Sequence, residues 1–133
     1  MYYLTEGKPS FLEDQYLDKV VTFASDFLSI EYDTVLDFTE DLGDTAGYVD
    51  IEHGEIVVYI NPAQSIIEIT RTIFHELVHA KQLLEGRLEE ACGINPAVWC
   101  GEPYHGKVYS EQPWEIEAYS VEEVMSSTFY REA

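Results

Sequence analysis

The sequence predicts an α+β fold in which a small sheet is combined with three helices. Apolar residues recur at helical spacing before residue 30, and short segments rich in β-branched residues follow between residues 34 and 60. A capping-box sequence then opens a second stretch of helical periodicity. The chain has 133 residues, 46% of them hydrophobic, so we expect residues 1–133 to form a single domain.

The first expected helix is the N-terminal one. Ser10 and Glu13 have the spacing of a capping box, which predicts that the helix begins at Ser10. The helical periodicity fades between Ser29 and Tyr32, where we expect the helix to end. The chain would therefore open with a helix and no preceding strand.

Three strands are expected after this helix, at residues 34–38, 48–51 and 55–60. Glu52-His53-Gly54 would join the last two as a hairpin, and Asn61-Pro62 would end the third. These segments predict a small, three-stranded and largely antiparallel sheet.

The second expected helix has clear signals at both ends. Ser65 and Glu68 form a capping box, and Gly86 is a typical stop after Glu85. Its apolar stripe follows a period close to 3.6 residues and consists of Ile66, Ile69, Ile73, Leu77, Ala80 and Leu84. We therefore expect a helix from residue 66 to about residue 85.

The rest of the chain is expected to be a long loop and a last helix. Residues 87–112 contain repeated glycine and proline and predict irregular chain with at most a short helical turn. Pro113 is a typical first residue of a helix. The core face of this helix is expected to consist of Trp114, Ala118, Val121 and Met125.

The second helix carries the sequence His75-Glu76-Leu77-Val78-His79. Histidines four residues apart lie on one face of a helix, one turn from each other, and can bind one zinc ion. Glu76 is offset by about 100° around the helix, where it can act as a general base without binding the metal. On a helix, this HExxH pattern is a strong signal of a zinc-dependent hydrolase.

The motif resembles that of the gluzincins, the thermolysin-like zinc peptidases, and especially their small one-domain members from phages and bacteria. In that family a third ligand comes from a glutamate on a later helix, often in the pattern Glu-x-x-Ala. Glu115-Ile116-Glu117-Ala118 matches this pattern at Glu115. The resemblance covers roughly residues 46–125 and implies a minimal zincin-like fold with Zn²⁺ held by His75, His79 and Glu115.

Glu117 is an alternative third ligand, because helical geometry alone does not choose between it and Glu115. The resemblance favours Glu115. Many gluzincins also carry an aspartate four residues after the ligand, which hydrogen-bonds a metal-binding histidine. Here that position is Tyr119, which departs from the family pattern.

Three further residues are weaker candidates for the site. His105 or Tyr109, in the long loop, could stabilise an oxyanion, although the sequence favours a loop histidine without a role. Arg71 lies one helical turn before His75 and could orient a carboxylate near the site, or could simply offset some of the acidic charge.

The expected activity is zinc-dependent hydrolysis of a peptide bond in a peptide or protein substrate. Zinc lowers the pKa of a bound water to about 7, and Glu76 would take the water's proton and pass it to the leaving amine. The resemblance further implies that an extended substrate pairs with the strand before the active helix, residues 55–60. A hydrolase of a non-peptide amide would carry the same motif.

The acidic composition suggests a different class of function. The chain has 26 Asp and Glu against 7 Lys and Arg, a formal net charge of −19. Such a field repels nucleic-acid phosphates and anionic membranes, so direct binding to either is not expected. The alternative to an enzyme is an acidic interaction protein, such as a DNA mimic or an inhibitor of a basic partner, with a vestigial metal site.

The location is predicted from what the sequence does not contain. No apolar run approaches the length of a transmembrane helix, and Met1–Glu6 does not have the pattern of a signal peptide. We therefore expect a cytoplasmic protein. Cys92 and Cys100 are too few for a disulfide framework and lack a usual zinc-binding spacing, so free thiols are expected.

Overall fold

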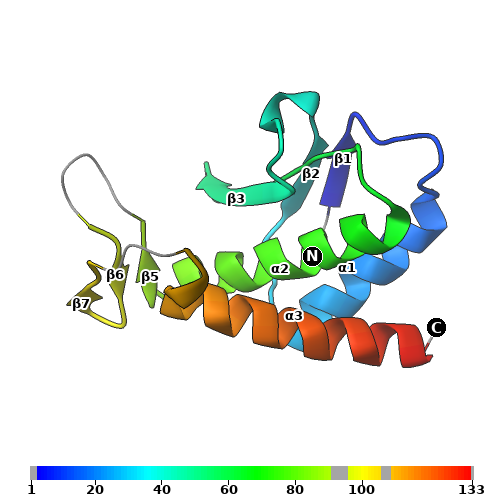
Figure 1. The fold of residues 1–133 in the computed structure, drawn as a ribbon. Helices are drawn as coiled ribbons and strands as arrows, with labels where there is room; N and C mark the ends of the chain where they lie inside the picture. Colours follow the sequence, from blue (N-terminus) through cyan, green and yellow to red (C-terminus); the bar gives the residue numbers. More distant parts are fainter. Residues whose placement is uncertain (1–2, 91–95, 106–108, 133) are drawn as a thin grey trace.

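The computed structural model describes residues 3–90, 96–105 and 109–132, and has an α+β fold. Its main helices are α1 (Asp14–Leu28), α2 (Ile66–Leu84) and α3 (Pro113–Glu132). The strands of the main sheet are β1 (Tyr3–Glu6), β2 (Thr34–Phe38), β3 (Gly47–Glu52) and β4 (Glu55–Ile60). Figure 1 shows α2 running between this sheet and α3. No helix among the described residues is long and apolar enough to cross a membrane.

The main sheet differs from the expected three-stranded, largely antiparallel one. It has four strands in the order β1-β2-β4-β3, with β1 and β4 each parallel to β2, and only β3 antiparallel to β4. The prediction missed β1 because this short edge strand buries neither face fully: Leu4 is 49% exposed, and Tyr3 is only half-buried. An edge strand of this kind has no clear alternation of apolar and polar residues.

The strand order also corrects the predicted pairing site for a substrate. β4, residues 55–60, is hydrogen-bonded to β2 on one side and to β3 on the other. Both of its edges are therefore filled, and it cannot accept an additional strand. At this end of the sheet β3 is the edge strand, and no other described strand pairs with its outer side.

The first helix begins four residues later than Ser10, so the capping box predicted there is wrong. Its N-cap is Glu13, whose side chain makes no capping hydrogen bond. The amide of Leu12 donates to the carbonyl of Pro9 at 3.1 Å, and the Leu12 side chain is fully buried. Burial of Leu12 in this turn places Ser10 outside the helix. The predicted end is confirmed, because Ser29 adopts the left-handed conformation that closes α1.

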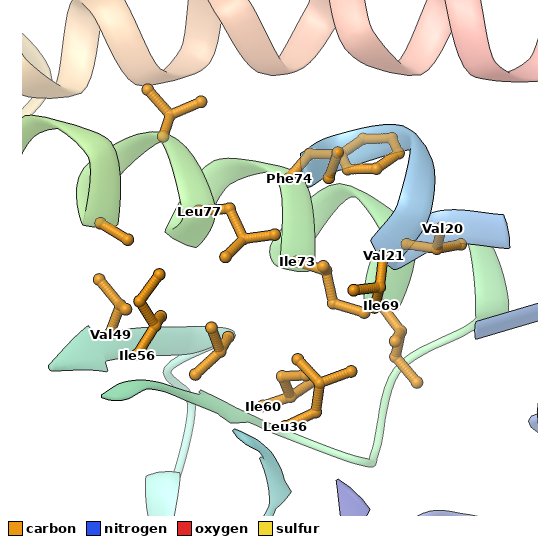
Figure 2. Packing of buried hydrophobic residues seen from close by; sticks show 14 of the residues in the cluster. Val20, Val21, Leu36, Val49, Ile56, Ile60, Ile69, Ile73, Phe74 and Leu77 are labelled. Carbon is orange, nitrogen blue, oxygen red and sulfur yellow. The ribbon is translucent and has the colours of Figure 1, made fainter. Parts of the chain in front are cut away.

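The second helix is confirmed at both ends. Ser65 and Glu68 form a complete capping box, in which each side chain accepts a hydrogen bond from the other residue's amide. Beyond the end, Gly86 has φ +73°, a conformation that favours glycine. Figure 2 shows Ile69, Ile73 and Leu77 of α2 pointing toward side chains of the sheet, and these contacts form the centre of the core. The predicted stripe fails only at its start, where Ile66 is 41% exposed.

Residues 87–112 contain more structure than the predicted irregular loop. Their described part forms a second, antiparallel sheet from β5 (Leu88–Glu89), β6 (Val98–Trp99) and β7 (Glu102–Pro103), followed by a short 3₁₀ helix, η2 (Tyr109–Glu111). Cys100 and Gly101, with φ 52° and 85°, make the tight turn between β6 and β7. This small sheet lies at the C-terminal end of α2 (Figure 1). The third helix begins at Pro113 as predicted, and its inward residues Trp114, Ala118 and Met125 are buried.

Candidate metal centre

The side chains of His75, His79 and Glu115 meet where α2 packs against the first turn of α3. The Nε2 atom of His75 lies 2.9 Å from Oε1 of Glu115, and Nε2 of His79 lies 3.0 Å from the same oxygen. All three residues are buried, with exposed fractions of 6%, 8% and 6%. One potential ligand atom from each residue therefore points to a common position.

The spacing of these three atoms fits a divalent metal ion. They lie within 4.8 Å of one another, and no other group of three among the described residues meets this condition. Zinc bound tetrahedrally at about 2.0–2.1 Å keeps its ligand atoms roughly 3.3 Å apart, slightly more than the separations seen here. A small outward movement of the side chains would therefore suffice. Two histidines and a carboxylate suit zinc, although other transition metals bind the same ligands.

The second nitrogen of the His75 ring is held by a carboxylate that the sequence analysis did not identify. Nδ1 of His75 donates to Oε1 of Glu122 at 3.0 Å, and the other oxygen of Glu122 accepts from Nε of Arg71 at 2.9 Å. Arg71 thus orients a carboxylate at the site, one of the two roles considered for it. Since Nδ1 carries the proton, the lone pair of neutral His75 is on Nε2 and faces Glu115.

Glu122 lies seven residues after Glu115, which places both on the same face of α3. The seven-residue spacing could have indicated that Glu122 accompanies Glu115. That prediction would also have required knowing that this face of α3 packs against α2. Tyr119, four residues after Glu115, packs its ring on His75 with centroids 4.4 Å apart. The hydrogen bond to Nδ1 of His75 is made by Glu122 and not by Tyr119.

The ring of His79 is held by a separate set of hydrogen bonds. Its Nδ1 donates to Oε1 of the fully buried Gln82 at 2.8 Å. The amide nitrogen of Gln82 in turn donates to Oε1 of Glu117 at 3.1 Å, and Arg87 donates to the other oxygen of Glu117 at 2.8 Å. Glu117 therefore does not meet the histidine nitrogens as Glu115 does. It supports the side chain that orients His79.

These contacts shift the pKa values of the three converging groups in the metal-free protein. Burial alone would lower the pKa of His75, but the hydrogen bonds to Glu115 and Glu122 outweigh burial and raise the pKa to about 9. Burial would likewise lower the pKa of His79, but the hydrogen bonds to Glu115 and Gln82 outweigh burial and raise it. Burial would raise the pKa of Glu115, but the two histidines lower it to about 2. Each histidine has an acceptor oxygen at both ring nitrogens, so the metal-free cluster favours protonated histidines ion-paired with a carboxylate.

Glu76 borders the cluster but is not hydrogen-bonded to it. Its side chain is 8% exposed and makes no hydrogen bond or ion pair with any residue that the structure describes. Burial raises the pKa of Glu76 to about 7, against the opposing charges of His79 and His75. A buried carboxylate without a partner is costly, which is typical of groups that act on a ligand.

A cavity of about 440 Å³ opens beside Glu76, His79 and Glu115, and we name it the β3 cavity. Its walls include Tyr48 and Val49 of β3, Leu88 of β5 and Trp114 of α3. A second cavity of about 410 Å³, lined by Arg71, His75 and Glu122 among others, shares Glu76 and Tyr109 with the first. Open space therefore flanks the candidate metal centre on both sides of Glu76.

The remaining sequence candidates lie at different distances from this centre. Tyr109 borders both cavities, and burial together with the negative charge of Glu115 raises the pKa of its hydroxyl. His105 is exposed and borders neither cavity, so the structure does not bring it to the site. Cys100 is a free, exposed thiol, and Cys92 lies outside the described residues.

Comparison with known proteins adds no relative. No protein-family model, curated protein sequence or solved structure matches the chain. The functional interpretation consequently depends on the geometry of the site and on the two motifs that resemble those of the gluzincins.

Proposed function

We propose that this protein is a zinc-dependent peptidase in which His75, His79 and Glu115 hold the metal and Glu76 is the general base. The observation that carries the proposal is the convergence of two histidine nitrogens and one carboxylate oxygen beside an unpartnered, buried glutamate. A surface HExxH sequence with no function would not need buried hydrogen bonds to the second nitrogen of each histidine. A divalent ion bound here would supply Lewis-acid polarisation of the substrate carbonyl and an activated water.

The role of Glu76 follows from its position in the β3 cavity. Its carboxylate is free to accept a proton from a water molecule that attacks the substrate carbonyl carbon. The same carboxyl group can return that proton to the leaving amine nitrogen when the C–N bond breaks. No other protein group competes for its oxygens among the described residues, so this transfer would require no rearrangement of Glu76.

The sheet supports the binding of an extended substrate. β3 is the edge strand at this end of the sheet, with no partner on its outer side among the described strands, and its residues Gly47, Tyr48 and Val49 line the cavity that Glu76 borders. A peptide paired with β3 would have its backbone held by main-chain hydrogen bonds while one carbonyl lies near the metal ligands. Tyr109, which borders the same cavity, is the candidate donor to the oxyanion.

The proposal is tested by measuring hydrolysis of a broad peptide library by the zinc-loaded protein and by its Glu76→Gln variant. Glutamine keeps the size of the side chain but cannot accept the proton, so we expect zinc to remain bound and hydrolysis to fall by roughly 10²-fold or more. A matched control is Glu123→Gln, which changes an exposed glutamate of α3 that borders neither of the two cavities at the centre. Full activity in Glu76→Gln would remove this residue from the mechanism.

The net charge of −19 favours one other function, the binding of a basic protein without catalysis. In that case the wild-type protein would bind a basic partner equally well with zinc removed, and no peptide in the library would be cleaved. Cleavage that requires zinc and Glu76 would exclude a purely non-catalytic role.

A further inference from the structure

The β3 cavity combines apolar walls with negative charge. Val49, Leu88, Ala97 and Trp114 contribute apolar surface, and the acidic residues that border it are Glu76, Glu90 and Glu115, of which Glu115 is paired with His75 and His79. None of its described lining residues is a lysine or arginine. The nearby Arg87 donates its hydrogen bonds to Glu85 and Glu117, so it is not available to offset this charge.

The three glutamates differ in the contacts that their carboxylates already make. Glu115 is engaged by the two histidines, and Glu76 is buried, unpartnered and assigned to proton transfer. Glu90 has neither role: it makes no hydrogen bond or ion pair with any residue in the described part of the chain. Glu90 is exposed and borders the cavity, and partial desolvation together with the nearby charge of Asp50 raises the pKa of its carboxyl group, so a cation there would be stabilising.

We propose that the β3 cavity binds a lysine or arginine side chain of the substrate peptide, next to the bond that is cleaved, with Glu90 as the specificity-determining residue. This proposal depends on the peptidase function proposed above. The long aliphatic part of such a side chain would pack on Val49 and Leu88 while its charged end reaches Glu90. Arginine can also form two parallel hydrogen bonds with one carboxylate.

The charge of the whole molecule supports the same class of substrate. A net charge of −19 attracts basic peptides and repels acidic ones over distances longer than a direct contact. Within the cavity, Glu90 is the carboxylate that is engaged neither by the histidine cluster nor by the proposed proton transfer. Glu90 would therefore determine which side chain enters, and the overall charge would increase the rate of encounter.

Binding without hydrolysis gives the first test. Two short peptide hydroxamates, identical except that one contains arginine and the other its uncharged analogue citrulline, are titrated calorimetrically into the zinc-loaded protein. We expect arginine to bind about tenfold more tightly or better, as for a hydrogen bond between charged groups. The preference should disappear in Glu90→Gln and persist in Glu89→Gln, a neighbouring exposed residue that does not border the cavity.

Cleavage of the peptide library separates the failure of this proposal from the failure of the proposed function. We expect lysine and arginine to be enriched at one position beside the cleaved bond, and the enrichment to be lost in Glu90→Gln. Cleavage by the wild type without that enrichment, or equal binding of the two hydroxamates, would overturn the basic specificity and leave the peptidase intact. A zinc-loaded protein that neither binds a hydroxamate nor cleaves any peptide would overturn both.

Discussion

At the scale of single residues, the centre depends on side chains that would not bind a metal themselves. Each histidine has one nitrogen directed at Glu115 and the other held by a buried hydrogen-bond acceptor, Glu122 or Gln82. Such hydrogen bonds fix the tautomer and the orientation of a histidine ring. The side chain therefore loses less conformational freedom when a metal binds. We infer that both networks contribute to metal affinity.

Glu122 provides a direct test of this idea. Glu122→Ala removes the acceptor for Nδ1 of His75, so we expect the affinity for zinc to fall by about 10–100-fold. Competition with a fluorescent zinc chelator measures the change. Glu123→Ala, at the next and exposed position of α3, serves as the control. Equal zinc affinity in both variants would show that Glu122 does not orient the ligand.

The residues that the sequence could identify are those whose signal is local. His75, Glu76 and His79 are close together on one helix, and the structure brings both histidines into the cluster with Glu76 beside it. Glu122 and Gln82 have no motif of their own, because their roles arise from packing between α2 and α3. Glu115 and Glu117 could be separated only by the orientation of α3, which helical periodicity alone does not determine.

At the scale of secondary-structure elements, the centre requires β3 to pass close to α2. A Cβ atom on Gly47 would lie 2.6 Å from the carbonyl oxygen of Tyr59 and 2.7 Å from Cγ2 of Thr72. The first contact is with the backbone of the paired strand, which a rotamer change cannot relieve. Glycine at this position therefore lets β3 lie against the helix that carries Glu76.

We expect Gly47→Ala to destabilise the protein by about 1–3 kcal/mol, as for other substitutions that overpack a core. Urea unfolding monitored by circular dichroism measures this loss. Displacement of β3 should also weaken the binding of the peptide hydroxamates, because Gly47 lines the β3 cavity. An alanine variant with wild-type stability and hydroxamate affinity would contradict the close packing described here.

Elements were predictable where their ends are encoded nearby. The capping box at Ser65 and the turn at His53-Gly54 involve residues within one turn of each other, and both were predicted correctly. The parallel pairing of β1 with β2 joins strands separated by the whole of α1, and no local pattern specifies it. The start of α1 was wrong because burial of Leu12 outweighed a capping sequence at Ser10.

At the scale of the whole molecule, metal binding should be coupled to proton release. The pKa of His75 is raised to about 9, so its ring is protonated at neutral pH in the metal-free protein. The pKa of His79 is raised as well, and both of its ring nitrogens face acceptor oxygens, which favours its protonated form. The Nε2 protons of both rings are shared with Glu115 and must leave before these nitrogens can bind a metal. Zinc binding should therefore strengthen as the pH rises.

Below a pH of about 9 we expect the apparent zinc affinity to fall as the pH is lowered, by about tenfold per pH unit for each proton released. Calorimetric titrations at pH 7.5 in two buffers of different ionisation enthalpy count the protons directly. An affinity independent of pH between 6 and 8, with no proton released, would contradict the ion-paired state described for the metal-free cluster.

The most direct test of the metal centre is the zinc content of the intact protein, measured by native mass spectrometry. We expect about one zinc per chain in the wild type, and none in His75→Ala when circular dichroism shows that this variant is folded. His53→Asn is the matched control, because it removes a histidine from a turn with φ 52° that asparagine tolerates, and it should keep its zinc. A wild-type protein without zinc, or a folded His75→Ala variant that retains one zinc per chain, would contradict the proposed centre.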